Sequence, residues 1–66
     1  MYIIETICKH IYNDNNKHIR VYDDFQKRVA LREYKKQVNR CKKVTSNIML
    51  YHDQELIDGT INFITI

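Results

Sequence analysis

Residues 2–12 alternate between two faces with a period of two, which is the pattern of a β-strand. The segment is rich in β-branched and aromatic residues, the types that strands favour. Its first face carries Ile3, Ile7 and Ile11 with two charged residues between them, and its second face carries Tyr2, Ile4, Thr6, Cys8 and Tyr12. Because neither face is purely polar, we expect a strand with apolar side chains on both sides.

A cluster of turn-forming residues follows this strand. Residues 13–17 read NDNNK, and such residues tolerate left-handed backbone and form Asx turns. The pattern predicts that the chain reverses here into a short second strand over residues 18–22.

The Asp-Asp-Phe-Gln sequence at residues 23–26 predicts the start of a helix. An Asp followed three residues later by Gln is a capping-box pattern, and two carboxylates suit the positive end of the helix dipole. No helix breaker occurs from there to about Lys43. A single apolar stripe runs along the predicted helix and comprises Ala30, Leu31, Tyr34, Val38 and Cys41.

Phe25 and Val29 lie on the side of the helical wheel opposite to this stripe. Two explanations stay open at this point. Either the end of a strand covers the first turn of the helix, or these two side chains meet another chain.

After the helix, Thr45, Ser46 and Asn47 return the chain to extended structure at residues 48–51. Residues 52–55 are polar and form a hairpin loop, and residues 56–66 form the last strand. Asp58 and Gly59 interrupt that strand, either as a type I′ turn or as a β-bulge. We favour the bulge, because only two residues would otherwise separate two turns.

These elements predict a single small α+β domain over residues 1–66. Its order is β-β-α-β-β, with a four-stranded, mainly antiparallel sheet and one amphipathic helix. One helix covers one face of such a sheet, so the other face is a candidate subunit interface. Its apolar residues would be Ile3, Ile7 and Ile11 with some of Ile61, Phe63, Ile64 and Ile66.

The length and composition also favour self-association. A chain of 66 residues buries only about 60% of the surface that it exposes when unfolded. A sequence with only two cysteines is not a disulfide-dense scaffold, so a homo-oligomer is the expected means of burying more surface.

Residues 1–12 have neither a basic leader nor a cleavage site, and no run approaches the roughly 20 apolar residues of a membrane span. We therefore expect a cytoplasmic protein with reduced thiols and no membrane partner.

The net charge of +3 hides a strong asymmetry. Residues 27–43 contain eight basic residues and one acidic residue, whereas the rest of the chain has three basic and seven acidic residues. Repulsion within the basic face favours a partner that neutralises it. An acidic protein surface, nucleic acid, the acidic part of another copy and a small anionic nucleotide held between subunits are the candidates. The members of this basic face are Arg28, Arg32, Lys35, Lys36, Lys42 and Lys43.

The residue types that support catalysis or metal binding lack the required spacing. The two cysteines and three histidines form no closely spaced ligand pair of the kind found in structural zinc sites. Ser46, His52 and Asp53 supply the atoms of a triad but no nucleophile-elbow glycines, and the paired carboxylates sit at a turn or a helix cap. We therefore predict no catalytic residue, no metal and no cofactor.

The segment HIRVYDDFQKRVALREYKKQ, followed by NIMLYHDQELID, resembles a pattern seen in small uncharacterised proteins of bacteriophages and mobile elements. The likeness spans residues 18–58, and the abundance of Ile, Lys and Asn suits an AT-rich coding sequence. The resemblance implies a stand-alone accessory protein that acts by binding in the cytoplasm of a host cell, commonly to block a host enzyme or an antiviral defence factor.

Together these observations predict a non-enzymatic inhibitor or modulator that acts by protein contact as a homo-oligomer. The predicted contact uses the helix face and tyrosines, with Arg28, Arg32, Lys35, Lys36 and Tyr22 as the binding residues. The alternatives are a nucleic-acid-binding protein that uses the basic helix 27–43 and a protein that sequesters a small anionic nucleotide.

Overall fold

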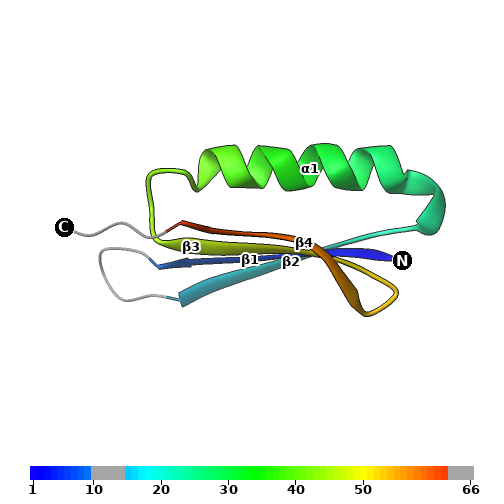
Figure 1. The fold of residues 1–66 in the computed structure, drawn as a ribbon, viewed down its shortest axis with the longest axis horizontal. Coiled ribbons are helices and arrows are strands. Elements are labelled where there is room, and N and C mark those ends of the chain that lie inside the picture. The colour runs from blue at the N-terminus through cyan, green and yellow to red at the C-terminus, as the bar shows by residue number, and fades with distance from the viewer. Residues whose placement is uncertain (10–14, 63–66) are drawn as a thin grey trace.

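Four strands form one antiparallel sheet, and a single long helix lies across one face of it (Figure 1). The computed structural model describes residues 1–9 and 15–62. The sheet order is β2-β1-β3-β4, and each neighbouring pair is antiparallel. This arrangement confirms the predicted α+β class and the β-β-α-β-β order. The elements are β1 (Tyr2–Lys9), β2 (Asn15–Tyr22), the 3-10 turn η1 (Asp24–Gln26), α1 (Lys27–Arg40), β3 (Ser46–His52) and β4 (Glu55–Asn62).

Strand β1 is central because it is apolar on both faces. It pairs with β2 on one side and with β3 on the other. Tyr2, Ile4 and Thr6 are buried beneath α1, whereas Ile3 and Ile7 lie on the opposite face. The predicted assignment of the two faces is therefore confirmed for this strand.

The predicted reversal at residues 13–17 is wrong for its second half. Strand β2 begins at Asn15, and Asn15, Asn16 and Lys17 pair with β1. The antiparallel ladder continues through these residues because tertiary pairing overrides a local preference for turns. Residues 13–14 lie outside the described part of the chain, as do Ile11 and Tyr12.

The helix begins as its capping pattern predicts. The side-chain oxygen of Gln26 accepts a hydrogen bond from the backbone N–H of Asp23 at 3.0 Å, and one 3-10 turn precedes α1. The helix ends at Arg40, before the predicted Lys43. The Ser46 hydroxyl donates to the carbonyls of Cys41 and Val44, both at 3.1 Å, and so stabilises the turn that replaces the last helical residues.

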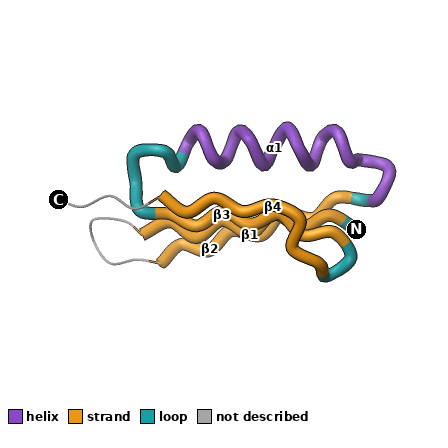
Figure 2. Tube along the Cα trace, in the orientation of Figure 1, coloured by secondary structure: helices purple, strands orange, loops and turns teal. Residues whose placement is uncertain are grey.

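Figure 2 shows α1 lying over one face of the sheet, and the hydrophobic core is formed by buried residues of these two layers. The register places Leu50 opposite Ile4 and Ile48 opposite Thr6, and the side chains of Ile4, Ile48 and Leu50 are fully buried. The predicted apolar stripe of the helix is confirmed. Its buried members are Ala30, Tyr34 and Cys41, and Leu31 and Val38 pack against the core while partly buried.

A two-residue turn joins β3 to β4. Asp53 and Gln54 both have positive φ angles, of 49° and 69°, which is the geometry of a type I′ hairpin turn. The predicted hairpin loop over residues 52–55 is thus confirmed. The predicted β-bulge is also present, but the pairs Leu50–Asp58 and Tyr51–Leu56 place the extra residue at Ile57.

The sheet face opposite α1, which we call the open face, is covered by no element of the described chain (Figure 1). The predicted placement of Ile3, Ile7 and Ile61 on this face is confirmed, whereas Phe63, Ile64 and Ile66 lie outside the described residues. By the strand register, the open face comprises Ile3, Glu5, Ile7, Lys17, Ile19, Val21, Asn47, Met49, Tyr51, Leu56, Gly59 and Ile61.

Candidate functional site

The outer face of α1, which points away from the sheet, carries the basic residues. Ala30, Tyr34 and Gln37 are buried against the sheet, so residues about half a helical turn away from them point outward. The structure brings four predicted binding residues together on this exposed face: Arg28, Arg32, Lys35 and Lys36.

Tyr22, the fifth predicted binding residue, lies in a different environment. It ends β2, pairs with the buried Tyr2 and packs against the hydrophobic core while partly buried. Its side chain therefore belongs to the layer between helix and sheet and not to the outer face of α1.

An apolar pair continues the outer face toward the start of the helix. The Phe25 side chain is 87% exposed and Val29 is 45% exposed. Within residues 1–9 and 15–62 no strand end covers the first helical turn, so the first of the two explanations left open by the sequence is wrong for the described chain. At 3.6 residues per turn, Val29, Arg32 and Lys36 lie along one line of α1, and the exposed Phe25 stands in the 3-10 turn just before it. We call these four residues the outer stripe.

The acidic residue of α1 does not neutralise this stripe. A Glu33 carboxylate oxygen lies 3.5 Å from Arg20 Nε on β2 and accepts a hydrogen bond from the Gln37 amide at 2.9 Å. Within residues 1–9 and 15–62, no ion pair joins a carboxylate to Arg28, Arg32, Lys35 or Lys36. The positive charge of the outer face is therefore available to a partner.

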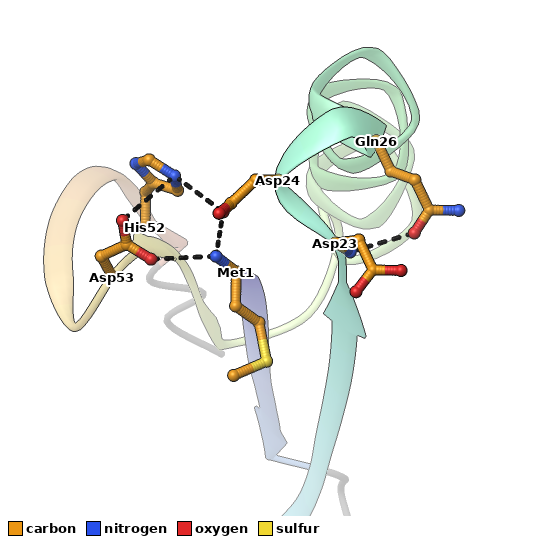
Figure 3. A network of polar contacts seen from close by, with 6 residues as sticks. All are labelled: Met1, Asp23, Asp24, Gln26, His52 and Asp53. Carbon is orange, nitrogen blue, oxygen red and sulfur yellow. Dashed lines mark hydrogen bonds and ion pairs between the residues drawn. The ribbon is translucent and has the colours of Figure 1, made fainter.

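A polar cluster at one end of the molecule was not predicted from the sequence (Figure 3). The amino group of Met1 donates to the carboxylates of Asp24 and Asp53, the latter at 2.9 Å. His52 Nε2 lies 3.2 Å from Asp24 Oδ1 and 3.6 Å from Asp53 Oδ2. The His52 ring also stacks on Tyr2, with ring centroids 4.2 Å apart. These contacts tie the start of β1 to the start of the helix and to the β3–β4 turn.

The Met1 amino group offsets part of the negative charge of the two carboxylates. Hydrogen bonds to Asp24 and then to Asp53 raise the pKa of the Met1 amino group, and the same amino group, followed by His52, lowers the pKa of Asp24. Ligand atoms of Asp24, His52 and Asp53 lie within 4.8 Å of one another, which is close enough to hold a metal ion. In this structure the Met1 ammonium already supplies the positive charge between the two carboxylates, so a metal would have to displace it.

The triad atoms noted in the sequence are not assembled. Ser46 begins β3 and His52 ends it, so the strand separates them by about 20 Å. The Ser46 hydroxyl is bonded to backbone carbonyls at the end of the helix. A pocket of about 270 Å³ lies at the other end of the strand and is lined by Met1, Ile3, Asp53 and Gln54.

The two cysteines meet at the opposite end of the core. The Sγ atoms of Cys8 and Cys41 are 3.0 Å apart, and both are free thiols. Burial, reinforced by the hydrogen bond to Cys8, raises the pKa of the Cys41 thiol to about 11. Their separation of 33 residues gives no local signal of this contact. The one available clue was that Cys8 shares the face of Tyr2 and Ile4 beneath the helix.

Comparison with known proteins returned no family model, no curated protein and no solved structure that matches this chain. Among the described residues, the 14-residue α1 is neither long enough nor apolar enough to cross a membrane.

Proposed function

We propose that this protein is a non-enzymatic inhibitor or modulator that docks the outer face of α1 on an acidic surface of a partner protein. The observation that carries the proposal is the outer stripe, in which two exposed apolar residues, Phe25 and Val29, are followed along the chain by two exposed cations, Arg32 and Lys36.

The apolar half of the stripe supplies affinity. Burying a Phe side chain that is exposed to water is worth about 1.5–3 kcal/mol, and aromatic anchors surrounded by weaker contacts dominate many protein interfaces. Phe25 is the most exposed of the large apolar side chains in the described chain, so it is the first candidate for such an anchor.

The basic half of the stripe supplies orientation and speed. Arg32 and Lys36 have no carboxylate partner among the described residues. An acidic patch on a partner would neutralise them, accelerate the encounter and fix the direction in which the helix lies. A partner with an apolar pocket beside an acidic patch therefore matches both halves.

The resemblance of residues 18–58 to small phage and mobile-element proteins supports a partner in the host cell, either a host enzyme or an antiviral defence protein. Nucleic acid is the alternative partner of the same helix. Phosphates require only the cations, whereas a protein pocket also uses Phe25 and Val29.

Affinity capture from a lysate of the source cell, followed by identification of the bound protein, tests the proposal. Capture of a specific protein should survive nuclease treatment and should be lost with Phe25→Ala and with the double variant Arg32→Glu, Lys36→Glu. Lys27→Glu is the matched control, because it is an exposed cation on a different side of the same helix. Binding that both outer-stripe variants leave unchanged, or that disappears with nuclease, contradicts the proposal.

A further inference from the structure

The open face is an apolar surface of the kind that proteins normally cover. Ile19 is 57% exposed, Val21 is 56% exposed and Ile61 is 71% exposed. Because strands are pleated, these residues stand on the same side of the sheet as Ile3, Ile7 and Met49. A monomer would thus expose several large apolar side chains to water on this face.

Among the side chains that the structure describes, the open face carries almost no free charge. Glu5 and Lys17 are the charged side chains described on it, and Lys17 Nζ lies 3.5 Å from the Glu5 carboxylate. The Glu5 side chain is only 20% exposed. A charged partner therefore gains little here, whereas another uncharged apolar surface fits.

Gly59 points to a close approach on this face. It is the only glycine in the chain and pairs with Met49 in the middle of β4. Its φ angle is not positive, and a Cβ atom added there would meet only the Ile48 carbonyl oxygen, at an ordinary 3.8 Å. Neither the backbone nor the described neighbours therefore require glycine. Glycine weakens a strand interior and often marks the point where another surface comes near.

The strand register shows which surface would fit over Gly59. The middle row of the open face runs across the sheet as Ile19, Glu5, Met49 and Gly59, from the β2 edge to the β4 edge. The side chain at the β2 edge of this row is a large isoleucine, Ile19, whereas the β4 edge has no side chain at Gly59. A second copy, turned by 180° about an axis parallel to the strands and lying between the sheets, places its β2 over β4.

We infer that two copies pack open face to open face in this orientation, with Ile19 of each copy seated over Gly59 of the other. The row that contains Ile7 then places Lys17 of one copy over Ile61 of the other at the rim, where the ammonium stays near water. Glu5 keeps its own Lys17 as counter-ion. Both outer stripes point away from the interface, so the dimer would offer two partner-binding helices.

The area of the face sets the expected strength of the dimer. Four strands of seven residues span about 440 Å² in projection, or about 900 Å² for two copies. Protruding side chains make each surface larger than its flat projection, so the solvent-accessible area buried in the dimer exceeds the projected area. The total is near the low end for specific interfaces, and a dissociation constant in the micromolar range is expected.

Sedimentation equilibrium over a wide range of protein concentration tests the inference. The average mass should rise from that of the 8.0 kDa chain to twice that value. Gly59→Val should weaken the dimer at least tenfold while the dilute monomer keeps its melting temperature, since a Cβ atom at this position makes only an ordinary contact in the protomer and the face around it is open. Ile19→Glu should abolish the dimer, and Val29→Glu, which adds the same charge on the outer face of α1, should not change it.

Two results would overturn the inference. One is a mass of a single chain at the highest concentration. The other is a dimer whose dissociation constant is unchanged in folded Gly59→Val, or is weakened by Val29→Glu and not by Ile19→Glu. The outer stripe lies on the other side of the molecule from the open face. A failure to bind the partner protein would therefore not change the dimer measured by sedimentation.

Discussion

Cys8 and Cys41 come from the central strand and from the residue after the helix, yet their sulfur atoms lie 3.0 Å apart. The helix α1 runs in the same direction as β1 and lies over it (Figure 1), so the end of β1 lies beneath the end of the helix and the two thiols meet. This contact links the two layers of the fold at one end, as the polar cluster around Asp24 does at the other.

Mild oxidation should convert this contact into a disulfide. Each thiol loses a proton and one electron to an added oxidant such as diamide, and the new bond closes a loop of 33 residues. Chain entropy then predicts a gain of about 3–4 kcal/mol in the free energy of unfolding. Thermal melts of oxidised and reduced protein measure the gain, with Cys8→Ser as the control. Equal melting temperatures for the two forms, once mass spectrometry shows the bond, would refute the prediction.

Stability should fall in alkaline solution. Burial raises the pKa of the Cys41 thiol from 9.0 to about 11. Above pH 9 the unfolded chain releases this proton before the folded chain does, so the free energy of unfolding falls as the pH rises from about 9 to about 11. Burial also raises the pKa of the Tyr34 hydroxyl, which acts in the same direction at higher pH. Denaturant titrations at several pH values should show a shallower decline for Cys41→Ala, and an identical slope contradicts this account.

The bond between the Tyr34 hydroxyl and the Thr60 hydroxyl, 2.9 Å long, joins α1 to β4. Tyr34→Phe should lower the free energy of unfolding by about 1–2 kcal/mol, since it removes the bond and leaves a partly buried hydroxyl without its partner. Thr60→Val deletes the other hydroxyl. In urea denaturation the double variant should lose less than the sum of the two single losses, whereas strictly additive losses would show that the bond contributes nothing.

Phe25→Ala should separate stability from function. The side chain is 87% exposed, so its removal should change the free energy of unfolding by less than about 0.5 kcal/mol. Binding to the captured partner should weaken at least tenfold by calorimetry or biolayer interferometry. A large loss of stability would show instead that Phe25 is a structural residue.

The sequence was sufficient for the features that repeat with a regular period. The alternation along β1 identified its two faces, and the stripe of Ala30, Tyr34 and Cys41 identified the buried side of the helix. In both cases buried residues recur every second residue in the strand and every third to fourth residue in the helix. Such a local pattern can be recognised without knowing which distant segments come into contact.

The sequence was insufficient where distant segments close on one another. The cluster of Met1, Asp24, His52 and Asp53 and the contact between the two thiols depend on how the layers are superposed. The position of the bulge at Ile57 depends on the β3–β4 register and not on the nearby Asp-Gly pair. The sequence separated Phe25 from the apolar stripe, but only the structure shows that its side chain is left uncovered.

The proposed dimer pairs Ile19 of one copy with Gly59 of the other across the two open faces. The most direct measurement is an isotope-filtered NMR experiment on a mixture of labelled and unlabelled protein at high concentration. We predict an intermolecular cross-peak between the Ile19 methyl groups and the Gly59 α-protons. Intermolecular cross-peaks that involve Val29 and the outer face of α1 in place of Ile19, or none at all, would contradict it.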